Sequence, residues 1–111
     1  MISIERRNNV DIISFTVDRI NALITEELRE EINKVFQNGS SKFVINLRNV
    51  RYIDSSGFGC LLLIMKTARN SFCTLKFASP EPEVMELLKT LFLDSVFNIH
   101  EDLDECIRSM R

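Results

Sequence analysis

Apolar and polar residues alternate along the first part of the chain in a way that predicts two strands. Ile2 and Ile4 alternate with polar neighbours, and a second alternating stretch runs from Val10 to Val17. A period of two is typical of strands, and the Asn8-Asn9 pair between the two stretches is a turn signal. The sequence therefore predicts that the chain opens with a β-hairpin.

Later stretches repeat their apolar residues at helical spacing, which predicts amphipathic helices. These stretches lie at about residues 24–36, 55–70, 84–91 and 103–110. Thr25 is expected to be the N-cap of the first helix, and Gly39 to end it. Pro82 suits the start of the third helix, because its missing N–H is not needed there. Asp102 and Glu105 match a capping box before the last helix.

Short apolar stretches separate these helices and predict further strands. Residues 43–47 lack clean alternation, as expected for a strand that is covered on both faces. Leu75 and Phe77 indicate another strand, and residues 96–99 a short last one. Strands that alternate with helices after a hairpin predict an α/β fold whose sheet has parallel members. Residues 1–111 are expected to form a single domain of this kind.

Composition excludes several classes of partner. The chain has a net charge of −2 and no basic block, which argues against nucleic acid as the main partner. The apolar run Cys60–Met65 is far too short to span a bilayer, so no membrane association is expected. The N-terminus lacks the basic region and apolar core of a signal peptide. We therefore expect a cytoplasmic protein.

Cysteine and histidine usage predicts neither a metal site nor a cofactor. The three cysteines are scattered, without a CxxC pair, and suit reduced thiols. Cys60 and Cys106 occupy apolar helical positions, where packing is the expected role. His100 is the only histidine and has no cluster of ligands near it in sequence. A Ser-His-Asp arrangement of Ser55, His100 and an aspartate is arithmetically possible, but no catalytic residue is assigned.

The stretch Tyr52–Gly59 is the most distinctive of the chain. It reads as a polar loop between the strand at 43–47 and a helix that opens at Asp54-Ser55-Ser56-Gly57. The first turn of a helix has free N–H groups and the positive end of the macrodipole, so an anion is stabilised there. The two serines can therefore be simple caps, or one can be a site of phosphorylation.

Residues Asn46–Gly59 resemble the signature of the STAS domain family, and within it of the anti-sigma-factor antagonists. The family pattern is D-L-x-x-V-x-x-[IM]-D-S-[ST]-G-[LF]-G, from which this chain departs at Asn46. The resemblance covers nearly the whole chain. It implies a mixed sheet of about five strands flanked by about four helices.

The resemblance also implies a function. The serine after the aspartate, Ser55, would be the phosphorylated residue. The unphosphorylated protein would bind an anti-sigma factor that is also a serine kinase of the histidine-kinase-like ATPase type, which would release a sigma factor. A PP2C-type phosphatase would restore Ser55. The alternative is a constitutive STAS scaffold, or an accessory subunit of a signalling or transporter complex.

Residues around Ser55 are assigned to partner binding. Asp54 is expected either to orient the hydroxyl or hold a metal-bound nucleotide of the kinase, or to cap the loop. Ser56 is expected to act as a cap. Gly57 and Gly59 are expected to allow a tight turn and close approach of a partner backbone. Phe58 is expected to be mostly core, with partial exposure as a partner contact.

Two residues after the second strand complete the predicted interface. The family often has a carboxylate at the position of Asn21, where in relatives it can face a basic residue of the kinase. Asp18 lies three residues earlier and is a candidate to compensate for this departure.

Overall fold

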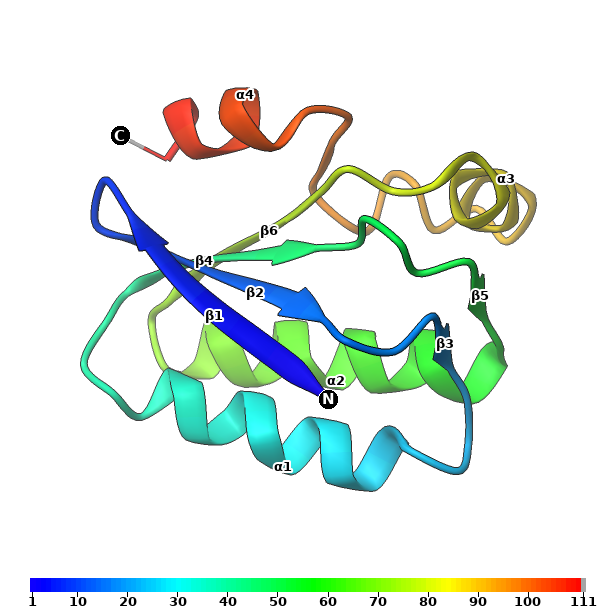
Figure 1. The fold of residues 1–111 in the computed structure, drawn as a ribbon, viewed down its shortest axis with the longest axis horizontal. Coiled ribbons are helices and arrows are strands. Elements are labelled where there is room, and N and C mark those ends of the chain that lie inside the picture. Colours follow the sequence, from blue (N-terminus) through cyan, green and yellow to red (C-terminus); the bar gives the residue numbers. More distant parts are fainter. Residues whose placement is uncertain (111) are drawn as a thin grey trace.

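A five-stranded mixed sheet runs through the middle of the molecule, described here over residues 1–110 of a computed structural model (Figure 1). The strand order is β1-β2-β4-β6-β7. The bounds are Ile2–Arg7 for β1, Val10–Phe15 for β2, Lys42–Asn46 for β4, Thr74–Ala78 for β6 and Ile99–His100 for β7. β1 is antiparallel to β2, and the other neighbours are parallel. The predicted α/β class is confirmed.

The predicted opening hairpin is formed by β1 and β2. Asn8 and Asn9 join the strands with positive φ angles of 53° and 66°. Two positive φ values in a two-residue loop are the signature of a type I′ turn, whose twist matches that of the flanking strands. Asparagine tolerates this conformation better than most residues. The second strand ends at Phe15, two residues before the expected end at Val17.

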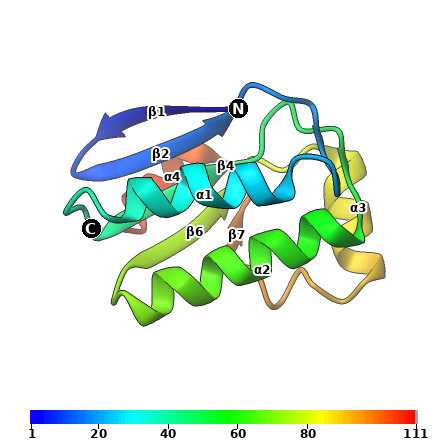
Figure 2. The same ribbon diagram turned by 90° about the horizontal axis from the view of Figure 1, so that it is seen from below.

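Four helices flank the sheet within residues 1–110, as expected (Figures 1 and 2). α1 (Thr25–Phe36) and α2 (Ser55–Asn70) lie side by side on one face. α4 (Leu103–Arg108) covers the other face, and α3 (Pro82–Thr90) packs beside the short strand β5 (Tyr52–Ile53). The starts of α1 and α2 lie at the same end of the sheet, because both helices follow parallel strands (Figure 2).

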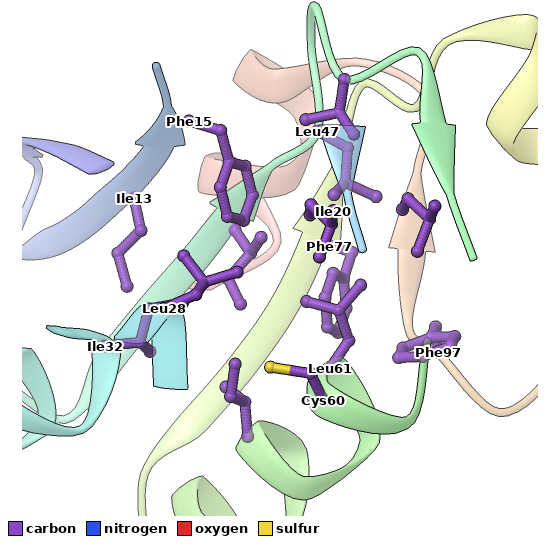
Figure 3. Packing of buried hydrophobic residues seen from close by; sticks show 14 of the residues in the cluster. Ile13, Phe15, Ile20, Leu28, Ile32, Leu47, Cys60, Leu61, Phe77 and Phe97 are labelled. Atoms are coloured by element: carbon purple, nitrogen blue, oxygen red, sulfur yellow. The ribbon is translucent and has the colours of Figure 1, made fainter. Parts of the chain in front are cut away.

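The core has two parts, one on each face of the sheet. The larger part lies between the sheet and the α1–α2 layer, and Figure 3 shows Leu28, Leu61 and Phe77 among its side chains. The smaller part lies under α4 and includes Val44 and Cys106. In β4, residues 43–45 are fully buried, so the prediction of a strand covered on both faces is confirmed.

A second, two-stranded sheet was not predicted. β3 (Arg19–Ile20) pairs in parallel with β5, in a segment between the second strand and the first helix for which the sequence predicts no strand. Each strand has two residues, which is too short for alternation to be visible. This small sheet matters because it lies directly under the start of α2.

Two boundaries of α1 differ from expectation, and the predicted start of α4 is confirmed. α1 ends at Phe36 with Gln37 as its C-cap, before the predicted end at Gly39. Thr25 is not an N-cap: the cap position is Ile24, and Thr25 is the first helical residue. The reason is that the Ile24 carbonyl already accepts the first helical bond, from Leu28 N at 2.9 Å. At α4, the predicted Asp102 cap is confirmed, with its carboxylate 2.9 Å from Glu105 N.

The last predicted strand is shorter than residues 96–99. Only Ile99 and His100 pair with β6. Val96 N and Phe97 N instead both donate to the Leu93 carbonyl at 3.0 Å, which closes a turn after α3. The apolar residues at 96 and 97 therefore belong to this turn, with Phe97 buried and Val96 exposed.

Candidate functional site at the start of helix α2

Asp54 is the N-cap of α2. Its backbone is extended, and its Oδ1 accepts a hydrogen bond from Gly57 N at 2.8 Å. This is the bond that a capping carboxylate makes to the third residue of a helix. The expected capping role of Asp54 is confirmed, whereas the expectation that Ser56 acts as a cap is wrong. Ser56 is the second residue of the helix, because the aspartate already occupies the cap position.

Asp54 also ties the start of α2 to the loop after β3. Its backbone N donates to the Ile20 carbonyl at 3.1 Å. Its second carboxylate oxygen, Oδ2, accepts from Ala22 N at 3.4 Å. One side chain therefore satisfies amides from two segments that are distant in sequence, and it fixes their relative position.

Ser55 and Ser56 stand on the tip of the helix and face solvent. Both are exposed, and neither hydroxyl makes a hydrogen bond within residues 1–110. The first turn of α2 contains no acidic residue. The free amides and the macrodipole therefore favour negative charge at this tip, and the carboxylate of the neighbouring Asp54 offsets part of this effect. The structure thus offers an accessible hydroxyl at a place that favours negative charge.

Gly57 lies under this tip, in contact with the small sheet. A Cβ at Gly57 would lie 2.5 Å from the Ile20 carbonyl oxygen and 2.7 Å from Cγ2 of Ile53. Both distances are too short for any side chain. Gly57 is buried, so the expectation that it lets a partner backbone approach is wrong: it lets α2 approach the chain's own β3 and β5.

Phe58 is buried. Its side chain is 3% exposed and belongs to the larger core cluster. The expectation that Phe58 is mostly core is therefore confirmed, and the expected partial exposure is wrong. The physical reason is that Phe58 points from the first turn of α2 towards the sheet, where other core residues surround it: Leu47, Ile53, Leu61 and Phe77.

An open groove, here called the α1–α2 groove, runs from the helix tip between the two helices. Its volume is about 640 Å³, and it is lined by Thr25, Glu26, Arg29, Ser56, Gly59, Cys60 and Leu63. Cys60 lies at its base, where burial raises the pKa of the thiol and the Arg29 guanidinium opposes that rise. A thiol of raised pKa is a poor nucleophile, so the packing role expected for Cys60 agrees with its environment.

Asp18 and Asn21 flank β3. The Asp18 carbonyl accepts from Arg51 N at 2.8 Å, and its side chain is exposed. Asn21 Oδ1 accepts from Leu23 N at 3.0 Å, which turns the chain towards α1. The next residue, Ala22, donates its backbone amide to Asp54 Oδ2, so Asn21 lies beside the link between this loop and the start of α2. The assignment of both residues to partner binding stays a prediction.

Asn46, the departure from the family signature, has its own structural role at the end of β4. Its Nδ2 donates to Ser14 Oγ at 3.2 Å, and its Oδ1 accepts from Arg48 N at 3.2 Å. A carboxylate could accept from Arg48 N but could not donate to Ser14. The amide thus links β4 to β2 without an added charge.

Sequence reasoning did not single out Leu23 or Arg29. Leu23 is 92% exposed and sits in the loop held by Asp54. Arg29 lines the α1–α2 groove together with Ser56, although the two belong to different helices. Their position near the helix tip depends on how α1 packs against α2, which no local sequence pattern predicts.

Residues 1–110 offer little support for a metal site, a catalytic triad or a membrane span. No group of three or more His, Cys, Asp or Glu side chains there could hold a metal ion. His100 Nδ1 lies 3.9 Å from Glu105 Oε1, and no hydrogen bond of these residues joins His100 to Ser55. Among the helices of the same residues, none is long and apolar enough to cross a membrane.

Comparison with known proteins identifies the family. The STAS domain model matches residues 1–106, so the chain belongs to the STAS domain family. A STAS-domain containing protein of Pseudomonas aeruginosa is 34% identical over 58 residues, which are 52% of this chain and 57% of that protein. The match thus spans little more than half the length of this relative.

Solved structures show the same fold at low sequence identity. A putative anti-sigma factor antagonist from Thermotoga maritima has a TM-score of 0.85 at 20% identity, covering 99% of this chain and 94% of that one. The phosphorylated form of the Bacillus cell fate determinant SpoIIAA has a TM-score of 0.71 at 18% identity, with all of both chains covered. A sulfate transporter family protein from Wolinella succinogenes reaches 0.73 at 12% identity, covering 94% and 86%. The expected five-stranded STAS architecture is thereby confirmed.

Proposed function

We propose that this chain is an anti-sigma-factor antagonist that is switched by phosphorylation of Ser55. In the unphosphorylated state it binds an anti-sigma factor that is also a serine kinase of the histidine-kinase-like ATPase type. Binding releases a sigma factor. The role is that of a regulated binding module, with no catalysis of its own, and it places the chain in the cytoplasm, where its proposed partners act.

The observation that carries the proposal is the Ser55 hydroxyl, exposed and unbonded on the first residue of α2. Because Asp54 caps the helix, the fold makes no use of this hydroxyl. The names of several structural neighbours point the same way, since they are anti-sigma factor antagonists and one is a phosphorylated form.

The proposed reactions change only the tip. The kinase transfers the γ-phosphoryl group of ATP to Ser55 Oγ, which yields phosphoserine, ADP and a proton. A PP2C-type phosphatase hydrolyses the ester with water and releases inorganic phosphate. Asp54, held by Gly57 N and Ala22 N, is placed beside Ser55 throughout, but its contacts are those of a cap.

Electrostatics sets the direction of the switch. A phosphoserine carries about −1.5 to −2 charges at neutral pH. In the free chain this charge is hydrated and lies at the positive end of α2. Under a protein partner it would lose water, at a cost that only new pairing could offset. Phosphorylation therefore favours the free chain, and its removal favours the complex.

The deciding experiment incubates the chain with a panel of candidate kinases and ATP, and maps phosphate by mass spectrometry. Phosphate on Ser55, absent from a Ser55→Ala variant, is the expected result. Phosphate on Ser56 alone would mean that the regulatory phosphorylation site is Ser56 and that the assignment of Ser55 is wrong. If kinases bind the chain but leave every serine unmodified, the switch is ruled out.

The second candidate is a constitutive STAS scaffold or an accessory subunit of a signalling or transporter complex. It is favoured by the structural similarity to a sulfate transporter family protein. The same panel separates the two functions. A scaffold binds its partner equally well whether residue 55 is serine or aspartate, whereas the switch requires a difference.

A further inference from the structure

We propose that the anti-sigma factor seats on the α1–α2 groove, and that Gly59 is the point at which its main chain comes closest. The inference rests on the proposed function and adds the surface and its chemistry. It starts from a residue that the fold itself does not explain.

Gly59 is the fifth residue of α2, inside a helix, where glycine is among the least favourable residues. A fold can require glycine for a left-handed backbone or for lack of space. Among the three glycines only Gly39 has a positive φ. A Cβ at Gly59 would meet nothing within 4 Å, in contrast to Gly57. The missing side chain is therefore of no use to the free chain.

The missing side chain does serve a partner. Gly59 lines the groove together with Ser56. Because it has no side chain, the main chain of α2 is directly accessible from the groove beside the helix tip. Leu63, one turn further along α2 and also in the groove, is 46% exposed. A bare main-chain surface followed by an exposed leucine is suited to a closely packed protein segment.

Continuity with Ser55 selects this side of the tip. An interface of standard size covers about 800 Å² on each partner, so a kinase that reaches Ser55 must cover one flank of α2 as well. On the other flank, Arg51 and Glu83 are already paired with each other at 3.4 Å. The groove flank instead begins at Thr25, two residues after Leu23, which is 92% exposed in the loop held by Asp54.

Charge on the surrounding surface indicates the chemistry of the occupant. The ionisable residues that line the groove, Glu26 and Arg29, balance each other. Glu27 and Glu30, exposed on the same two turns of α1 outside the lining, make the surface beside the groove net negative. We therefore expect the partner to present a basic surface, which also steers the encounter at low salt.

The first test needs no partner. If Gly59 has no internal role, Gly59→Ala raises the thermal unfolding midpoint, by about 4 °C or more, because alanine is the better helix former. A lowered midpoint would show that the fold itself requires this glycine. That result would overturn the inference even if the proposed function holds.

The second test is calorimetric titration of the ADP-bound kinase that phosphorylates Ser55 in the panel. Gly59→Leu is expected to weaken binding at least tenfold. Two controls should stay within twofold: Asn70→Leu, which adds the same side chain about three turns away on the same helix, and Glu83→Ala on the opposite flank. Wild-type affinity of Gly59→Leu, or loss of affinity in Glu83→Ala alone, would place the partner elsewhere. If no kinase binds the wild-type chain, the proposed function has failed, which is a different result.

Discussion

The carboxylate of Asp54 accepts a hydrogen bond from the backbone amide of Ala22 at 3.4 Å, across 32 residues of sequence. The same carboxylate caps α2 through Gly57 N at 2.8 Å. Asp54 is therefore a structural link between the helix tip and the β3–α1 loop. The two segments that we assign to partner binding are held together by one side chain.

Asp54→Ala should destabilise the chain by about 1–2 kcal/mol, because it removes the cap and leaves two amides without their acceptor. Asp54→Asn keeps one acceptor oxygen and should cost less. Urea unfolding, compared at equal m-values, measures both. Ser56→Ala is the control, since its hydroxyl does not cap; a loss there as large as in Asp54→Ala would contradict the assignment.

Gly57→Ala should destabilise the chain by about 1–3 kcal/mol, because the new methyl group would be driven into the Ile20 carbonyl and the Ile53 side chain. The expected sign is opposite to that of Gly59→Ala, although both replace a glycine in the same helix. Thermal unfolding of the two variants side by side checks this. Equal stability of both would mean that β3 does not limit the space under the tip.

Ser55→Asp should leave the fold intact and weaken binding of the kinase. An acidic residue at the first helical position gains from the macrodipole, while Asp54 next to it opposes the gain, so we expect stability within about 0.5 kcal/mol of wild type. Affinity should fall at least about tenfold, because the new charge is desolvated in the complex. Ser55→Ala, which adds no charge, should bind like the wild type. Equal affinity of the aspartate variant would count against the switch.

Stability should fall at alkaline pH because of Cys106. Burial is the main reason why the pKa of this thiol rises from 9.0 to about 11; Lys76 opposes the rise and Glu105 adds to it. Between these values the folded chain keeps the thiol proton and the unfolded chain loses it. The free energy of unfolding therefore falls with pH in this range, by up to about 1.4 kcal/mol per unit.

Chemical unfolding at pH 8, 9 and 10 measures the slope, with Cys106→Ala as the reference. The variant should lose less stability over this range than the wild type. The pKa of Cys60 is also raised, so some slope should persist in the variant. Identical slopes would show that Cys106 ionises no differently in the folded chain.

Local sequence patterns were sufficient for the main elements. The Asn8-Asn9 turn, the unbroken apolar run of β4 and the Asp102 cap each depend on residues within a few positions of one another. Such features are visible in sequence because propensity and periodicity act locally. The same holds for Asp54, whose cap partner is three residues away.

The features that the sequence did not reveal depend on contacts between distant segments. The pairing of β3 with β5 involves two residues in each strand, and nothing local distinguishes them from a loop. The close neighbour of Gly57, Ile20, is remote in sequence, so no local pattern shows that the glycine is needed inside the fold. An apolar helix start alone does not show which side meets the sheet, so the complete burial of Phe58 is visible only in the structure.

The contact of Gly57 with the Ile20 carbonyl leaves no empty space beneath the first turn of α2. A group attached to the Ser55 oxygen consequently has to extend outward, and the scaffold below cannot yield to absorb it. A modification of Ser55 would therefore change the shape and charge of the exposed surface while the backbone beneath it stays in place, so a binding protein could detect it without any refolding of this chain.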